Sequence, residues 1–511
     1  MKQWETFVQQ GILGTNRQPL QLPTIEGMAA LWSQVATFDQ ETQFLQAAAL
    51  LGQYRIAGSL PVSLPTTAGV PPCPAESTAP APTGAVTLLR QLLTDGDTKL
   101  LAEWLHHAAD HTMYAPHALL PPLLELAIKQ RPLAAALAPC LGERGRWLMG
   151  LHPAWQITAA EVIDETDWRV GSSEARLRFL QEYRRRDPLT ARTLLEASWT
   201  QEPAKERALL LGALRSNLST ADEPFLEQAL GDRSQAVRTE AVRLLAGLSG
   251  SRLQQSLLST LTTYVTVERK WLRRTLQVQL PPSFQPDWAA LGIREQSPLG
   301  VRVGQKAGWL VQLVALLPPS ALVAHLGVDA VEFLDLVRTS DFAEALRMAV
   351  LEGAETHQDH AFLLAELHHL QRLLALDQAP ISEWLDRFVR YAPLLPPPTR
   401  EQVLQRYLTT QQKAAFPDWT TLGAVMRLFD QLSVTNTTQL LQEHLPLLRQ
   451  RNTNDYGIGR ILLDAAYILA PAGYPVAVKL FVRPLEERPD YIDHFLRIYQ
   501  VRYQMEKEFS Q

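Results

Sequence analysis

The sequence predicts an all-α fold in which stacked pairs of helices form a solenoid, followed by an additional C-terminal helical region. Two observations lead to this prediction: apolar residues recur at helical spacing along most of the chain, and one helix-pair pattern is repeated. Convincing alternation of apolar and polar residues, as expected of strands, is not found. The 511 residues also exceed the size at which one compact core usually keeps growing.

The clearest helix is predicted in DRSQAVRTEAVRLLAGL, residues 232–248. Asp232 is the expected N-cap, because its carboxylate can accept hydrogen bonds from the free amides of a first helical turn. Gly247 and Gly250 are expected to end the helix. One apolar face is formed, at spacings i, i+4, i+7, i+8 and i+11, by Val237, Ala241, Leu244, Leu245 and Leu248.

The same layout recurs upstream, where Leu210 matches Leu244 at an offset of 34 residues. Aligning Arg207 with Arg238 instead gives an offset of 31 residues, so the register stays open by about one turn. Two short helices cannot bury both apolar faces alone, and neighbouring pairs must therefore stack. This pattern resembles a HEAT repeat, in which Asp232 and Arg238 are expected to pair within or between repeats.

The chain divides by composition into five segments. Residues 59–84 contain seven prolines and predict an extended linker, or a strap laid across a surface. The helical repeats are clearest at 187–250. The predicted segments are an N-terminal helical region at 1–58, the Pro-rich linker or strap at 59–84, helical repeats at 85–280, a loop at 281–300 and a C-terminal helical region at 301–511.

Composition and charge restrict the function. Apolar residues make up 46% of the chain and charged residues 20%, which is typical of globular proteins. The net charge of −5 argues against a dedicated nucleic-acid binder. Cys73 and Cys140 are too few for a disulfide framework, and no apolar run or N-terminal signal indicates a membrane or secretion. We expect a cytoplasmic protein that does not bind a membrane.

Basic residues gather in ERKWLRRTL, which we expect to form one helix. Its possible partner or phosphate surface consists of Arg269, Lys270, Trp271, Arg273 and Arg274. Arg184, Arg185 and Arg186 form a second cluster. Such residues on a repeat surface can contact an acidic protein or grip phosphates, and they are also the ordinary solvated face of a long helix.

Other candidates for chemistry are weak. His357 and His360 share a face if they lie on one helix, but a metal site needs a third converging ligand. Gly457 and Gly459 precede a predicted helix without the strand and third glycine of a dinucleotide site. The chain has no nucleophile-elbow or phosphate-loop motif. We therefore expect a non-enzymatic protein with no catalytic residues, no cofactor and no bound metal.

Several segments together resemble a bacterial family, domain of unknown function 5691. They include GILGTNRQPLQLP (11–23), AAALLGQYRIAG (47–58), CLGERGRWLMGLHPAW (140–155) and DEPFLEQALGDRSQAVRTEAVRLLAGLSGSRL (222–253). The resemblance implies a helical-repeat protein with no assigned activity. It also implies a genetic neighbourhood that holds a MoxR-type AAA+ ATPase, a von Willebrand factor A-domain protein and a SWIM zinc-finger protein.

From the capped, repeated helix pairs we expect an interaction scaffold or adaptor that binds protein partners, among them, by the family resemblance, an AAA+ ATPase or an A-domain protein. Solenoids present long surfaces that fit extended partners. The alternative is a nucleic-acid-binding helical-repeat protein that uses the basic face at 269–274. An unrecognised hydrolase or metalloenzyme is the third hypothesis.

Overall fold

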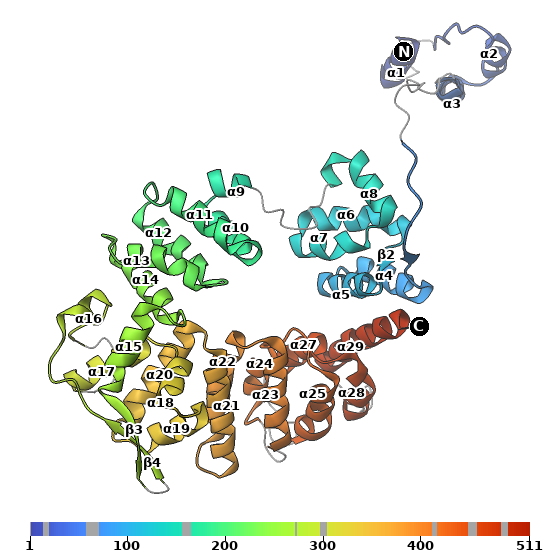
Figure 1. Cartoon of the computed structure of the whole chain (residues 1–511). Coiled ribbons are helices and arrows are strands. Elements are labelled where there is room, and N and C mark those ends of the chain that lie inside the picture. Colours follow the sequence, from blue (N-terminus) through green and yellow to red (C-terminus); the bar gives the residue numbers. More distant parts are fainter. Residues whose placement is uncertain are drawn as a thin grey trace. The chain divides into compact units, whose positions relative to one another are not determined.

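A computed structural model describes most of the chain (Figure 1). The described residues are 2–13, 20–57, 71–155, 165–270, 273–296, 304–410, 416–447, 457–481 and 489–510. They are mostly helical, with only two small two-stranded sheets among them, so the predicted all-α helical-repeat fold is confirmed. The chain forms two compact units, Met1–Cys73 and Pro74–Gln511.

The first unit contains α1 (Lys2–Leu13), α2 (Ala29–Val35) and α3 (Gln40–Ala57). The Phe7 and Phe44 rings stack with their centroids 4.8 Å apart. The buried core of the unit is small and consists of Phe7, Val35, Ala47 and Leu51. Such a core is typical of a module that contributes little stability by itself.

The second unit begins with two short strands and five helices. These are β1 (Ala79–Pro80), α4 (Thr83–Asp95), α5 (Thr98–Asp110), β2 (Met113–Tyr114), α6 (Leu120–Lys129), α7 (Arg131–Leu137) and α8 (Gly142–Leu151). The HEAT-like section follows as α9 (Glu165–Val170), α10 (Ser173–Arg186), α11 (Pro188–Ser198), α12 (Ala204–Gly212), α13 (Glu223–Ala229) and α14 (Gln235–Gly247). After it come α15 (Arg252–Thr262) and the hairpin β3 (Val265–Lys270) and β4 (Arg273–Val278).

The remaining helices continue to the C-terminus. They are α16 (Pro286–Ala290), α17 (Gln305–Ala315), α18 (Pro319–Leu326), α19 (Ala330–Arg338), α20 (Ala343–His357), α21 (His360–Ala375), α22 (Ile381–Tyr391), α23 (Pro397–Thr410), α24 (Trp419–Met426), α25 (Val434–Gln439), α27 (Ile458–Ile468), α28 (Tyr474–Phe481) and α29 (Asp490–Phe509). A π-helical turn, η7 (Leu440–His444), follows α25 directly. Short 3-10 turns are η1 (His117–Leu119), η2 (Ala138–Cys140), η3 (Pro153–Trp155), η4 (Ala213–Arg215), η5 (Thr220–Asp222), η6 (Ala392–Leu394) and η8 (Pro471–Gly473).

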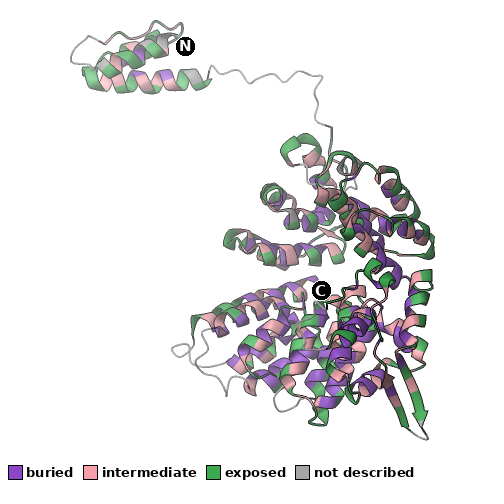
Figure 2. Ribbon diagram, turned by 90° about the vertical axis from the view of Figure 1, so that its left-hand side faces the viewer, coloured by how far each residue is buried: buried purple, intermediate pink, exposed green. Residues whose placement is uncertain are grey.

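The second unit has two hydrophobic cores, and helices that are far apart in the sequence share one of them. One core, spanning 180–245, belongs to α10–α14. The other joins the helices from α15 onward with α4–α7, because the C-terminal helix α29 packs against both α4 and α5. The range 85–280, predicted as one repeat section, is thus divided between the two cores. Figure 2 shows the buried residues of these helices along the contacts between neighbours.

The helix pairs α11–α12 and α13–α14 confirm the local prediction in most respects. Four of the five predicted face residues of 232–248 lie within α14, all five are buried, and the helix ends at Gly247. The predicted N-cap is wrong: the helix starts after Ser234, and Asp232 lies before it. The Asp232 carboxylate instead pairs with Arg207 of α12 at 2.9 Å, while Arg238 donates to the Asp232 backbone carbonyl at 2.7 Å. Asp232 therefore connects adjacent repeats.

Residues 74–82 of the Pro-rich segment form a strap within the second unit. Ala79 and Pro80 pair in parallel with Met113 and Tyr114. The Glu76 carboxylate accepts hydrogen bonds from the backbone N–H groups of Glu143 at 2.6 Å and Arg144 at 3.0 Å, and contacts His117 Nε2 at 2.8 Å. Burial would raise the pKa of Glu76, but these hydrogen bonds outweigh it and lower the pKa.

A substitution at Gly142 tests whether this carboxylate holds the strap. Gly142 has φ +61, and a Cβ there would lie 2.5 Å from a Glu76 carboxylate oxygen. We expect Gly142→Ala to destabilise the protein by about 1–2 kcal/mol and to make residues 74–82 more sensitive to protease. Gly96→Ala is the control, because Gly96 has φ +72 with nothing near its Cβ position. Equal protease sensitivity in both variants would contradict the role of Glu76.

No described helix is both long and apolar enough to cross a membrane by itself. Helices α17 and α18 reach that length and composition only as a pair that bends by 100° at the prolines between them.

Candidate interaction surface

The predicted basic surface lies on a β-hairpin and not on a helix, which corrects the sequence-based expectation. Strand β3 pairs antiparallel with β4, and the register places Arg269 opposite Arg274 and Lys270 opposite Arg273. Val265 and Leu276 are buried at the base and anchor the hairpin in the larger core. Figures 1 and 2 both show the hairpin extending away from the helices.

The hairpin places like charges directly across from each other. Both cross-strand pairs at its end are cationic, and like charges directly opposite each other destabilise a strand pair. Arg274 is partly neutralised by Glu332 at 3.0 Å and donates to the Gly327 carbonyl at 3.3 Å. The exposed side chains of Arg269 and Arg273 have no ion-pair partner among the described residues. Among the described residues, the end of the hairpin therefore carries an excess of positive charge.

The five predicted residues are only partly described. Arg269, Arg273 and Arg274 have described, exposed side chains. Lys270 is placed by its backbone pairing, and its side chain lies outside the described residues together with Trp271. The structure brings the four basic positions together across two strands.

A signal for the hairpin was present in the sequence. Val265 and Val267 alternate with polar residues before the turn, and Leu276 and Val278 alternate after it. The turn between them contains no glycine, proline or asparagine, so the usual hairpin mark is missing. Without such turn residues, the many charged residues of ERKWLRRTL and its Leu and Trp residues favoured the prediction of a helix.

The second basic cluster is not a surface patch. Arg184 is completely buried, and its guanidinium pairs with the Asp222 carboxylate at 3.0 Å and donates to the carbonyls of Pro188, Leu214, Ser216 and Asn217. Arg185 and Arg186 are exposed and pair with Glu182 on the same helix. Arg184 therefore has a structural role in the core, whereas Arg185 and Arg186 form ordinary ion pairs on the surface.

The histidines singled out in the sequence do not share a helix face. His357 ends α20 and His360 starts α21, with Gln358 at φ +51 between them. The His357 ring donates from Nε2 to the Leu316 carbonyl at 2.7 Å, and burial lowers its pKa to about 4. Among the described residues no group of three or more His, Cys, Asp or Glu side chains could hold a metal ion.

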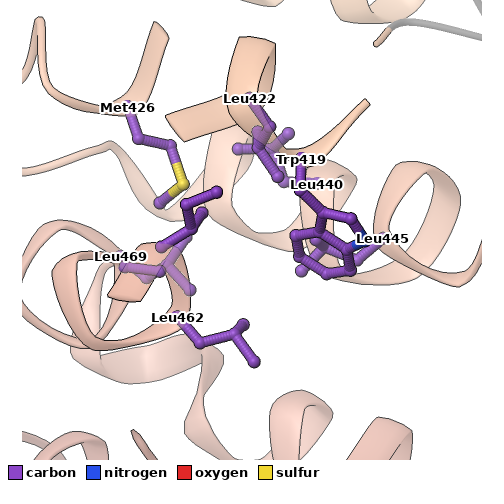
Figure 3. Close-up of a pocket in the computed structure, with 9 residues that line it drawn as sticks. Trp419, Leu422, Met426, Leu440, Leu445, Leu462 and Leu469 are labelled. Carbon is purple, nitrogen blue, oxygen red and sulfur yellow. The ribbon is translucent and has the colours of Figure 1, made fainter. Parts of the chain in front are cut away.

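Two concavities can be set aside as ligand sites. The first, shown in Figure 3, is a void of about 10 Å³ between α24, η7 and α27, lined by apolar side chains such as Trp419, Leu422 and Met426. It has room for about one water molecule and offers that water no polar wall. The second is an open hollow of about 380 Å³ along α22, where Glu383 pairs with Arg347 and Arg390 with Glu355.

Gly457 precedes α27, as predicted, whereas Gly459 is the second residue of the helix, which begins at Ile458. A Cβ at Gly459 would lie 3.2 Å from Tyr491, so close packing against α29 explains this glycine. Cys140 is buried, and burial raises the pKa of its thiol to about 12, which makes it inert at neutral pH.

These features define an all-α helical-repeat protein with a basic hairpin inserted between its helices. The chain belongs to a family of unknown function, DUF5691, whose family model matches residues 6–509. No curated protein and no solved structure matches the chain.

Proposed function

We propose that the protein is a non-enzymatic, cytoplasmic scaffold or adaptor that binds protein partners, with the end of the β3–β4 hairpin as a contact for an acidic surface. The hairpin carries the proposal, because its register sets Arg269 against Arg274 and Lys270 against Arg273 at a cost to folding. Local rules of this kind are usually broken at functional sites. Stacked helix pairs add a rigid surface suited to extended partners.

Ion pairs between repeats support a rigid array. Arg207 of α12 is bonded to Asp232 ahead of α14, and Arg184 of α10 to Asp222 ahead of α13. Arg207 bridges to the next helix pair, and Arg184 reaches past α11 and α12 to the turn before α13. Both links limit sliding of the helices over one another. A rigid array loses little entropy on binding.

The family resemblance gives this proposal its first partners to test, a MoxR-type AAA+ ATPase or a von Willebrand factor A-domain protein. The experiment is a pull-down of the chromosomally tagged protein from its own cells, with mass spectrometry and nuclease-treated controls. We expect nuclease treatment to leave recovery of such a partner unchanged. Recovery of nucleic-acid-associated proteins only, lost on nuclease treatment, would favour the nucleic-acid alternative.

The hairpin is tested by the double substitution Arg269→Glu and Arg273→Glu. We expect at least a tenfold loss of partner recovery, because two attractive charges become repulsive ones. The matched control is Arg460→Glu with Arg497→Glu: both arginines are exposed on α27 and α29, and the change in net charge is the same. If both double variants lost partner recovery equally, or if neither did, the hairpin would not be the contact site.

Nucleic acid is the second candidate, favoured by four cationic positions at one hairpin end. Fluorescence anisotropy with labelled duplex DNA and RNA across a salt series tests it. Phosphate contacts release counterions, so real binding weakens steeply as salt increases. Absence of binding at low salt would eliminate this candidate and leave the protein scaffold.

A further inference from the structure

The outer edge of strand β3 is not covered by another strand. The hairpin is a sheet of two strands, and no third strand among the described residues pairs with either of them. Strand β4 packs beside α19, where Arg274 pairs with Glu332. Strand β3 contacts α15, which leads directly into it, and is exposed beyond its buried base at Thr266, Glu268 and Arg269. An uncovered edge presents backbone N–H and C=O groups with which another chain can pair.

The register shows which backbone groups lie on this edge. The Gln279 N–H donates to the Tyr264 carbonyl at 2.7 Å. Hydrogen-bonded and non-hydrogen-bonded pairs alternate along an antiparallel ladder, so Val267 and Arg269 fall in non-hydrogen-bonded pairs with β4. Their N–H and carbonyl groups therefore point away from β4. Because the two residues are two positions apart, these groups have the spacing at which an added strand forms its own ladder.

The charges beside this edge favour one kind of added strand. Arg269 is exposed on β3, and the next position, Lys270, is also basic. Arg273 is exposed on β4 directly across from Lys270. Toward the base, Glu268 adds one negative charge and Thr266 is neutral. Opposite charges on neighbouring strands stabilise their pairing, so Asp or Glu is favoured opposite Arg269 and Lys270.

The same features disfavour two other occupants of the edge. A second copy of the hairpin would bring a further set of arginines beside Arg269 and Arg273, and like charges on neighbouring strands destabilise their pairing. A nucleic acid can contact arginines through its phosphates, but it has no peptide N–H and C=O groups with which to extend a ladder. An acidic, extended protein segment matches both the charge and the backbone groups.

We infer that the outer edge of β3 binds an extended acidic segment of a partner protein, which adds to the hairpin as a third, antiparallel strand. This inference rests on the proposed function, in which the end of the hairpin contacts an acidic surface, and it specifies the form of that surface. Backbone hydrogen bonds to Val267 and Arg269 provide affinity. Acidic side chains of the segment opposite Arg269 and Lys270 provide specificity.

The test is fluorescence anisotropy of labelled peptide probes titrated with the full-length protein. The parent probe, Glu-Glu-Thr-Val-Thr-Val with blocked ends, is designed to lie antiparallel to residues 265–270. One derivative is N-methylated at its second Glu and first Val, whose N–H groups would face Arg269 and Val267. The matched control is N-methylated at both Thr residues, whose N–H groups would face away from β3. A third derivative has two Lys residues in place of the two Glu residues.

We expect the first N-methylated probe and the Lys probe each to bind at least tenfold more weakly than the parent and the control. Equal binding of the two N-methylated probes, or no binding of the parent at millimolar concentration, would overturn the inference. Binding that depends on charge but not on N-methylation would overturn strand addition alone and leave the acidic contact of the proposed function standing. That contact is tested separately, by partner recovery with Arg269→Glu and Arg273→Glu.

Two proline variants assign the binding to one edge of the hairpin. Val267→Pro removes an N–H on the outer edge of β3 without removing a bond of the existing ladder. Val278→Pro is the matched control, because Val278 also lies in a non-hydrogen-bonded pair but its N–H is on the outer edge of β4. We expect the first variant to bind the parent probe at least tenfold more weakly and the second to bind it like the unmodified chain. Equal affinities of the two variants would overturn the inference.

Hydrogen exchange of the unmodified protein gives a readout that needs no variant. Saturation with the parent probe is expected to slow exchange at residues 266–270 of β3 more than at residues 273–278 of β4. Slower exchange in β4 alone, or in neither strand, would also overturn the inference.

Discussion

Replacement of Asp222 by Ala is expected to lower the free energy of unfolding of the α10–α14 section by about 3–5 kcal/mol, because it leaves the guanidinium of Arg184 buried without a counter-ion. Arg184 is 0% exposed and Asp222 is 1% exposed, so neither charge is screened by water. The Asp222 carboxylate also accepts hydrogen bonds from the N–H and hydroxyl groups of Ser219, which the substitution removes.

Hydrogen exchange followed by mass spectrometry is the measurement of choice, because the second unit has two cores and a single unfolding transition cannot be assumed. Faster exchange is expected in α10–α14 and little change in α21–α29. Glu182→Ala is the control: its ion pairs with Arg185 and Arg186 are exposed to water, and we expect little or no loss of stability. Similar losses in the two variants would contradict the structural role of Arg184.

Replacement of Arg502 by Met is expected to lower the free energy of unfolding by about 3–5 kcal/mol and to loosen the contact of α29 with α5. Arg502 is 2% exposed. It donates from Nε to both carboxylate oxygens of Glu103 at 2.7 Å and from Nη1 to the carbonyls of Ala466 and Leu469 at 2.7 Å. The substitution therefore leaves one carboxylate and two carbonyls without their donor.

The loss of stability caused by Arg502→Met should become smaller as the pH is lowered. Burial already raises the pKa of Glu103 although Arg502 opposes it, and loss of Arg502 raises this pKa further. A group whose folded pKa is raised favours folding most below its unfolded value and least above its folded value. The deficit should thus shrink as the pH falls toward the ordinary glutamate value of 4.5.

Chemical denaturation of both proteins at pH 5 and pH 8 measures this difference. The control is Arg497→Met, an exposed position on the same helix, which should change stability by no more than about 0.5 kcal/mol. A deficit that grows on acidification would show that Glu103 is not the group left unpaired.

The sequence predicted the residues of the candidate surface but not the β-hairpin on which they lie. The sequence singled out Arg269, Arg273 and Arg274 by their charge. The register, which places a cation opposite a cation, depends on how β3 pairs with β4. The turn contains no residue type from which this pairing could be predicted. A cavity lined by α14, α17 and α20 left no sequence pattern at all, because its lining residues are far apart in the chain and only tertiary packing brings these helices together.

The sequence by itself determined the all-α class, the apolar face and C-terminal end of α14, and the recurrence of helix pairs, because helical periodicity and glycine stops act over a few neighbouring residues. Only the tertiary structure decided that α29 packs against α4 and α5, and that α10–α14 have their own core. It also separated buried Arg184 from exposed Arg185, which are adjacent in the same run of arginines. These outcomes depend on which distant helix covers a given face, and that is decided by shape and charge complementarity between segments that local patterns do not relate.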